Sequence, residues 1–275
     1  MSVDFADVDR SNVEQCVAFL DCVFTLPEAR AYKQRTFELL NLRPSDCVLE
    51  VGCGTGDDAT ALGRRLDGGE VVGIDLSHAM IAEATRRAKT EALPVRFQQA
   101  DVNRLPFAPA TFSAVRIDRV LHILPDPTDA VSEVARVLQW GGRLVATEAD
   151  WNSLRVEGAG PDLDCRMREF ISGQQGADVG SRLSSLFEAA GLTVFEVERV
   201  QFETSDLEQA ATLMHLENLA AAALSARALT ENEILDWLRG LQEASLRKAF
   251  RASLTGYTVA ASKSMGVVMS SDGGV

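Results

Sequence analysis

The stretch Val48-Leu-Glu-Val-Gly-Cys-Gly-Thr-Gly-Asp-Asp58 places a glycine-rich turn directly after an apolar, strand-like run and directly before a helix-like segment. Gly52, Gly54 and Gly56 carry no Cβ, so the backbone can bend tightly there and leave room for a ligand. The following helix presents free backbone N–H groups at its N-terminus. The turn therefore predicts a site where a nucleoside-sized ligand touches the backbone, although a plain tight turn can have the same pattern.

The spacing within this turn separates two kinds of nucleotide ligand. The dinucleotide fingerprint G-x-G-x-x-G, counted from Gly52, needs a glycine at position 57, where this chain has Asp57 followed by Asp58. Two carboxylates would repel a pyrophosphate, but they tolerate S-adenosylmethionine, which carries an ammonium and a sulfonium charge. The alternative is that both side chains only complement the helix dipole.

Acidic residues mark the ends of three strand-like runs. Glu50 lies in the first run, Asp75 ends Val-Val-Gly-Ile-Asp, and Asp101 follows Phe-Gln-Gln-Ala. Asp75 could accept hydrogen bonds from both ribose hydroxyls, as the matching carboxylate does in NAD sites. Asp101 could accept from an adenine amino group. Together the three residues predict an adenosine-containing ligand without choosing which one.

Strand-like and helix-like segments alternate between about residues 46 and 149. Strands are expected at 47–51, 70–74, 95–99, 112–117 and 142–148, and helices between them imply a parallel sheet covered on both faces. Beyond it we expect an irregular, Gly-rich stretch over about 152–180 and a helix over 181–190. A strand over 192–203, helices over 206–249 and a strand over 254–261 come next. The first 40 residues have helical spacing.

Composition excludes several classes of protein. The 275 residues are 46% hydrophobic and 24% charged, which is typical of a globular protein. The formal net charge of −13 makes nucleic acid and anionic membrane poor partners. No apolar run approaches the about 18 residues of a membrane span, and the five cysteines form no C-x-x-C pair, so no metal is expected. We expect a soluble, cytoplasmic monomer or homodimer that binds a small molecule.

Five ordered segments resemble one known family. Over about residues 35–150, and more loosely to 263, the chain is similar to class I, Rossmann-like S-adenosylmethionine-dependent methyltransferases, nearest to the small-molecule type of quinone biosynthesis. Glu50 replaces the commoner aspartate of that family, and Trp140 replaces the proline before its paired glycines. The segments are Glu50-Val-Gly-Cys-Gly-Thr-Gly56, Gly-Ile-Asp75-Leu-Ser, Ala-Asp101-Val with Leu105-Pro-Phe107, Arg119-Val-Leu-His122-Ile-Leu-Pro-Asp-Pro127, and Arg136-Val-Leu-Gln-Trp-Gly-Gly-Arg-Leu144.

The resemblance implies an α/β fold with a Rossmann-like, seven-stranded, mostly parallel sheet, an antiparallel last strand and helices on both faces. It implies an N-terminal helical cap over 1–40 and a methyltransferase domain over 41–263, with a helical lid inserted over 206–249 and a flexible tail over 264–275. It also implies S-adenosylmethionine as cofactor and S-adenosylhomocysteine as product. The residues expected around the cofactor are Glu50, Gly52, Cys53, Gly54, Gly56, Asp75, Leu76, Met80, Asp101, Val102, Ile117, Asp118 and Arg119, with Tyr32 and Arg35 as candidates for its carboxylate.

A general base is optional in methyl transfer, because thiolates, amines and phenolates attack without one, whereas an alcohol or a carbon acid needs its proton removed. His122, just after the fourth strand, is the candidate base, and a histidine hydrogen-bonded within its own segment is the plainer alternative. Trp151 and His215 are candidates for the substrate pocket, although His215 could equally pack on the surface.

The leading hypothesis is methyl transfer to a small, apolar or aromatic metabolite at O, N, S or C. No Asn/Asp-Pro-Pro-Tyr/Phe signature follows the fourth strand, which argues against amino-methylation of bases or protein glutamine. Two alternatives remain open at this point. The same cofactor site could serve non-methylating chemistry such as cyclisation, and an NAD-dependent oxidoreductase is a further, weaker possibility.

Overall fold

A single seven-stranded sheet organises the chain. The computed structural model describes residues 5, 7–89 and 91–264, and its strands follow the spatial order β3-β2-β1-β4-β5-β7-β6. β7 pairs antiparallel with both β5 and β6, while the other pairs are parallel. The predicted fold is therefore confirmed. The strands are β1 (Cys47–Val51), β2 (Glu70–Asp75), β3 (Val95–Gln99), β4 (Phe112–Asp118), β5 (Leu138–Glu157), β6 (Thr193–Thr204) and β7 (Arg251–Ser262).

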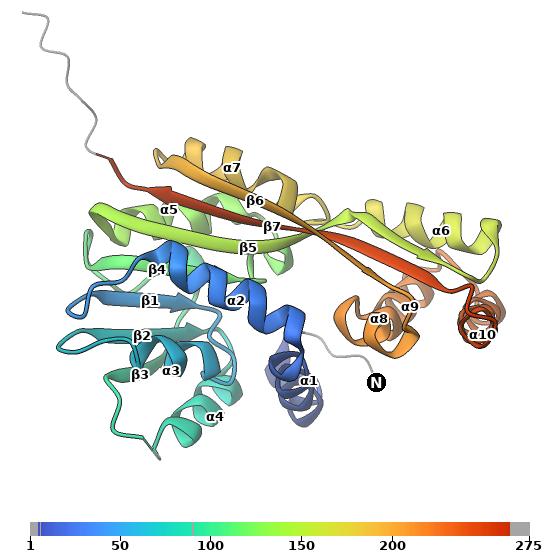
Figure 1. Ribbon diagram of the computed structural model, residues 1–275, viewed down its shortest axis with the longest axis horizontal. Helices are drawn as coiled ribbons and strands as arrows, with labels where there is room; N and C mark the ends of the chain where they lie inside the picture. The colour runs from blue at the N-terminus through green and yellow to red at the C-terminus, as the bar shows by residue number, and fades with distance from the viewer. Residues whose placement is uncertain (1–4, 6, 90, 265–275) are drawn as a thin grey trace, which may run out of the picture.

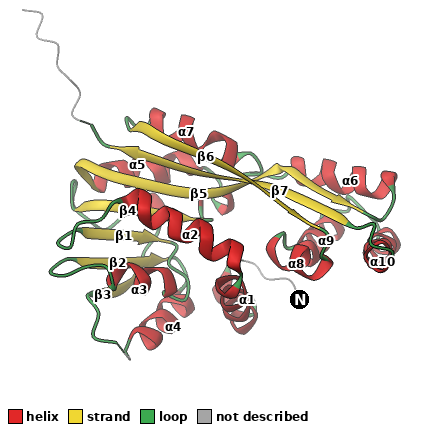
Figure 2. Cartoon of the chain, viewed as in Figure 1, coloured by secondary structure: helices red, strands yellow, loops and turns green. Residues whose placement is uncertain are grey.

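Helices cover both faces of the sheet (Figures 1 and 2). α5 (Pro127–Val137) and α7 (Val179–Ala189) bury their apolar sides in the larger core cluster on one face. α2 (Pro27–Leu40) and α3 (Asp57–Gly63) bury theirs on the other, and α4 (His78–Ala88) packs beside β2 and β3. Three 3-10 turns complete this part: Val8–Arg10, Val102–Arg104 and Leu121–Ile123.

The last three strands are much longer than the first four and run beyond the helices of the main sheet (Figure 1). Their far halves carry a second core cluster in which Trp237 is fully buried. The helices of this second lobe are α6 (Pro161–Ser172), α8 (Leu207–Leu213), α9 (Leu216–Ser225) and α10 (Glu231–Leu246). α10 opens with the capping box of Thr230 and Glu233 that its sequence predicts.

The prediction of an irregular stretch over about 152–180 is wrong. β5 continues to Glu157, and α6 and the start of α7 occupy most of the residues between Glu157 and Gly180. The ladder between β5 and β7 shifts register between Asp150 and Arg155, which breaks the alternation of inward and outward side chains. Pro161 stands at the first position of α6, where a proline fits a helix although it also signals a break.

The N-terminal residues form helices, as their spacing predicts: α1 (Val13–Thr25) and α2. No helix among the described residues is long and apolar enough to cross a membrane. The flexible tail expected over 264–275 lies, apart from Ser264, outside the described residues. The division into cap, methyltransferase domain and lid stays a prediction.

Candidate functional site

A cavity of about 470 Å³ lies at the carboxyl ends of β1, β2 and β4. α1 and the N-terminal turn form its opposite wall through Val8, Phe19, Leu20 and Val23. His215, at the junction of α8 and α9, contributes a further part of the wall. Segments far apart in the sequence therefore enclose one space.

The glycine turn after β1 forms the floor of this cavity. Gly52 and Gly54 have φ angles of 65° and 50°, which disfavour any residue with a side chain. A Cβ on Gly52 would lie 2.3 Å from Val120, and one on Gly54 would lie 3.0 Å from Leu20 of α1. The turn thus brings bare backbone to the cavity and lets α1 approach it closely.

Asp75 at the end of β2 is fixed by the backbone of this turn. Its Oδ2 accepts a hydrogen bond from the Gly54 amide (2.9 Å), and its Oδ1 accepts one from the Ser77 amide (2.9 Å). Burial raises the pKa of Asp75 above its ordinary value, while the two amides oppose that rise. The carboxylate is held still at the cavity wall, where its remaining lone pairs can accept from ligand hydroxyls.

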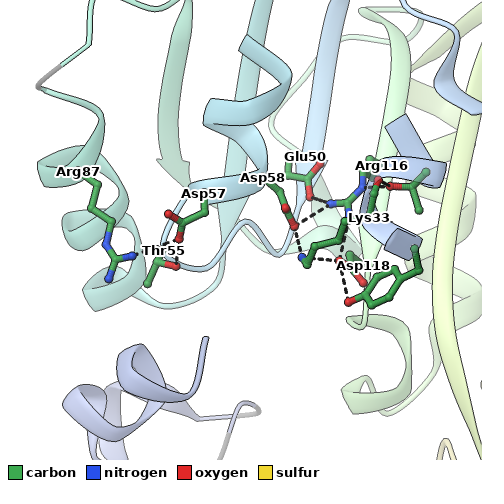
Figure 3. Close-up of polar contacts among 10 residues, drawn as sticks. Lys33, Glu50, Thr55, Asp57, Asp58, Arg87, Arg116 and Asp118 are labelled. Atoms are coloured by element: carbon green, nitrogen blue, oxygen red, sulfur yellow. Dashed lines mark hydrogen bonds and ion pairs between the residues drawn. The ribbon is translucent and has the colours of Figure 1, made fainter. Parts of the chain in front are cut away.

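A buried charge cluster occupies the end of the cavity under α2 (Figure 3). Arg116 of β4 is completely buried and donates to Glu50, to Asp58 (3.2 Å) and to Asp118 (2.8 Å). Lys33 of α2 contacts Asp58 and lies 2.8 Å from Asp118. Two cations therefore meet three carboxylates in a space with little water.

Three carboxylate oxygens of this cluster have no hydrogen-bond partner among the described residues: Glu50 Oε2, Asp58 Oδ1 and Asp118 Oδ1. Buried acceptors without a partner are uncommon in folded proteins and are costly. All three residues line the cavity, but these oxygens themselves are buried, so a ligand with N–H or O–H donors would reach them only after the side chains turn toward it.

Burial and neighbouring charge set the protonation of the cluster. Burial raises the pKa of Glu50 to about 8, although Arg116 opposes the rise. Burial would also raise the pKa of Asp118, but Lys33 and Arg116 together hold it below its ordinary value. The cluster is therefore neutral with Glu50 protonated and carries one negative charge with Glu50 ionised. A cation bound beside it favours the ionised state.

Across the cavity, His122 is held by a buried carboxylate. Glu148 is completely buried, and its Oε1 accepts from the amides of Val120 (2.8 Å) and Leu121 (2.6 Å). Its Oε2 lies 2.7 Å from Nδ1 of His122. An acceptor at that distance places the ring proton on Nδ1 and leaves Nε2 as a proton acceptor. Gly176 packs behind this group, since a Cβ there would lie 2.3 Å from the carbonyl oxygen of His122.

Aromatic rings surround His215 at the same end. The His215 ring lies 4.4 Å from that of Phe19 and 6.2 Å from that of Trp151, and Trp151 lies 6.1 Å from His122. Nη2 of Arg119 lies 2.8 Å from Nε2 of His215. Burial, together with the charge of Arg119, lowers the pKa of His215 to about 3. The imidazole is thus neutral at pH 7 and accepts from Arg119.

Acid should destabilise the fold through His215. Its pKa is lower in the folded chain than its ordinary value of 6.5, so protonation favours unfolding as the pH falls from 6.5 toward 3. In urea titrations at pH 7 and pH 4.5, the His215→Asn variant should lose about 2–3 kcal/mol less unfolding free energy than the unaltered protein. Asparagine suits the left-handed backbone there, with φ of 52°. Equal losses in both proteins would contradict a neutral, buried His215.

The structure brings most of the sequence-predicted site residues to one cavity, although their roles stay predictions. Those that line it are Tyr32, Glu50, Gly52, Cys53, Gly54, Asp75, Leu76, Met80, Asp101, Val102, Asp118, Arg119, His122 and His215.

Four predicted residues are not part of the cavity wall. Gly56 is the N-cap of α3, with φ of 84°, and a Cβ there would lie 2.7 Å from Phe97. Its lack of a side chain therefore lets the helix pack closely on the sheet. Ile117 is completely buried in the main core. Arg35 pairs with Glu198 at 2.6 Å, on the side of α2 away from the cavity. Trp151 contacts the two histidines from beside the cavity.

Lys33, Asp58 and the apolar residues of α1 belong to the site but were not among the predicted ligand contacts. Two polar attachments hold this N-terminal wall in place. Asp9 accepts hydrogen bonds from the amides of His78 (3.0 Å) and Ala79 (3.1 Å) at the start of α4. Asp21 of α1 pairs with Arg87 of α4 at 2.6 Å.

Among the described residues, no three His, Cys, Asp or Glu side chains are grouped so as to hold a metal ion. Residues 48–142 match a family described as "Methyltransferase domain". A 37.1 kDa protein in a transposon of Streptomyces fradiae, itself uncharacterized, is 33% identical over 258 residues, which cover 92% of this chain and 73% of that protein.

Two further likenesses are to methyltransferases. The demethylmenaquinone methyltransferase of Thermus thermophilus is 39% identical over 117 residues, or 42% of this chain and 53% of that enzyme. The chain thus spans about half the length of the quinone methyltransferases that it matches. The structure of a Haemonchus contortus phosphoethanolamine N-methyltransferase in complex with S-adenosyl-L-methionine has a TM-score of 0.61 at 18% identity, covering 96% of this chain and 60% of that one.

Proposed function

Because the chain belongs to the class I S-adenosylmethionine-dependent methyltransferases, we propose that it methylates a small metabolite with an aromatic or otherwise apolar body, using His122 as general base. The observation that carries this proposal is the pairing of His122 with buried Glu148 at the wall of the cavity that contains the glycine turn. A base is needed only when the acceptor atom bears a proton to be removed. We therefore propose an oxygen or carbon acceptor.

The cavity residues fit the cofactor of this family. Bare backbone at Gly52 and Gly54, the fixed carboxylate of Asp75 and the unpartnered oxygens of the charge cluster suit a ligand with a ribose and an ammonium group. Asp75 would accept from the ribose hydroxyls, and Lys33 would meet the carboxylate of the methionine moiety. When bound, the cofactor supplies a methyl group that is activated by the sulfonium charge.

The remaining work of the site falls to the chain's own side chains. Glu148 keeps the imidazole of His122 in the tautomer whose Nε2 accepts a proton. The rings of Phe19 and His215 form an apolar wall that orients a flat acceptor, and Trp151 supports the His215 ring from beside the cavity. α1 excludes water from the reacting atoms, since most of its cavity residues are apolar.

The direct test has two parts. The purified protein is titrated calorimetrically with S-adenosylhomocysteine and, separately, with NAD. It is then incubated with S-adenosylmethionine and a metabolite library, and products are weighed by mass spectrometry. Micromolar binding of S-adenosylhomocysteine alone, together with a product heavier by one CH2, is expected. Binding of NAD alone would overturn the proposal, and a converted substrate of unchanged mass would point to cyclisation or another rearrangement.

Asp75→Ala should weaken binding of S-adenosylhomocysteine by about 100-fold or more, because two charge-assisted hydrogen bonds to the ribose are lost together. Calorimetry on the folded variant measures this. Asp67→Ala is a matched control, since Asp67 lies at the other end of β2, in the connection from α3, and outside the cavity wall. Unchanged affinity in Asp75→Ala would remove this residue from the cofactor site.

A further inference from the structure

Arg119 brings a positive charge to the acceptor end of the cavity. Its backbone is held by a hydrogen bond from its amide to the carbonyl of Thr147 (2.9 Å), in a left-handed conformation with φ of 59°. Its guanidinium contacts Nε2 of His215 at 2.8 Å. Throughout the described part of the chain, no carboxylate lies within ion-pair distance of it. A cation lining a cavity without an anionic partner is costly unless a ligand supplies one.

His215 cannot be the anionic partner of Arg119, because its imidazole is neutral. Buried among aromatic rings, it takes one N–H of the guanidinium, and the other N–H donors of Arg119 stay free for a ligand. His215 also has a left-handed backbone, with φ of 52°. Arg119 and His215 therefore both have a costly left-handed backbone, and their side chains contact each other. This contact fixes the direction of the guanidinium.

We propose that the molecule methylated by this protein carries a carboxylate, which Arg119 binds while the ring or chain of the substrate lies along the rings of His215 and Phe19 and its reacting atom faces His122. This inference rests on the proposed function, whose site it extends. The planar fork of a guanidinium matches a carboxylate with two parallel hydrogen bonds. Trp151 lies between the two ends, 6.2 Å from the ring of His215 and 6.1 Å from that of His122.

Charge and acidity favour a carboxylate over other oxygen acids. A phosphate dianion would bring two negative charges to one unpaired cation, next to the Asp118 carboxylate of the charge cluster. A phenol has a pKa near 10 and is neutral at pH 7, so it gains little from a cation unless the site deprotonates it. A carboxylate with a pKa near 4 arrives already charged, and its single charge equals that of Arg119.

The test uses the full chain saturated with S-adenosylhomocysteine and three probes of similar size: benzoate, benzamide and phenol. Binding is followed by calorimetry and by tryptophan fluorescence, with Trp151→Phe identifying the signal. Benzoate should bind about 10-fold or more tightly than benzamide or phenol. Arg119→Met should abolish that preference, Arg119→Lys should keep part of it, and Arg239→Met, which removes an exposed arginine of α10, should keep all of it.

Three results would overturn the proposal: equal binding of benzoate and benzamide, no binding of benzoate, or an unchanged preference in Arg119→Met. A loss of S-adenosylhomocysteine affinity in Arg119→Met with the preference intact would assign Arg119 to the cofactor instead. The proposed function fails separately, if the unaltered protein does not bind S-adenosylhomocysteine; the preference for benzoate can then still be measured on the protein alone.

Discussion

Replacing His122 by alanine is expected to slow the methyl-transfer step by about 10²–10⁴-fold, the usual contribution of a positioned base. The affinity for S-adenosylhomocysteine should change by no more than about twofold, because alanine removes only the ring that faces the acceptor. A single turnover of the acceptor found by product mass, followed with the protein in excess over that acceptor, gives the rate of this step. Calorimetry on the same sample gives the affinity.

Glu148→Gln separates the base from the residue that positions it. Glutamine keeps the size of the side chain but can present an N–H to Nδ1 of His122, which favours the wrong tautomer. Glu148→Gln is therefore expected to slow methyl transfer less than His122→Ala does, and to shift the pH dependence of its rate. His78→Gln, at an exposed histidine on α4, is the matched control. Full activity in His122→Ala would show that the acceptor reacts without a base, as an amine or thiolate does.

The second large effect concerns stability. Arg116→Met should lower the unfolding free energy by about 3–5 kcal/mol, because it leaves Glu50, Asp58 and Asp118 with Lys33 as their remaining cation in the cluster. Urea titration followed by circular dichroism measures the loss. Raising the pH from 6 to 9 should increase it. Burial raises the pKa of Glu50 to about 8 while Arg116 opposes the rise, so without Arg116 this pKa is higher still, and the folded variant goes on losing stability above pH 8, where the unaltered protein no longer does.

An exposed ion pair provides the control. Arg96 and Glu70 lie 3.3 Å apart with side chains about half exposed, so Arg96→Met should cost no more than about 1 kcal/mol. Arg116→Lys keeps the charge but loses the planar fork, and should fall between the two. If Arg116→Met cost as little as Arg96→Met, the carboxylates of the cluster would have to take up protons without penalty.

The sequence predicted the sheet and the turn well, because both depend on local patterns. Short apolar strands alternating with helical spacing leave few topologies, and the glycines mark the cavity floor directly. The length of β5 was not predictable in the same way. One register shift between Asp150 and Arg155 removes the alternation that identifies a strand, although pairing with β7 continues beyond it.

The charge cluster shows where sequence reasoning stops. On α2 the buried positions Ala29, Thr36, Phe37 and Leu40 recur at helical intervals, and this spacing places Lys33 on the inner face and Arg35 outside. That signal was present, but the candidates predicted for the cofactor carboxylate are Tyr32 and Arg35, and not Lys33; Tyr32 lines the cavity, whereas Arg35 does not. The partners of Lys33 are Asp58 of α3 and Asp118 of β4, which lie 25 and 85 residues further along the chain, and no spacing rule joins them.

The attachment of the N-terminal wall has a consequence for the rate of turnover. β5 and β7 pair along both lobes, so parting the lobes would break backbone hydrogen bonds. The wall formed by α1 and the turn before it is held instead by side chains alone: a small apolar cluster of Val8, Cys16 and Met80, and the polar contacts of Asp9 and Asp21. Ligands should therefore be exchanged by detachment of this wall. We expect product release, and not the chemical step, to limit turnover, and a pre-steady-state burst of one methyl group per site should reveal it.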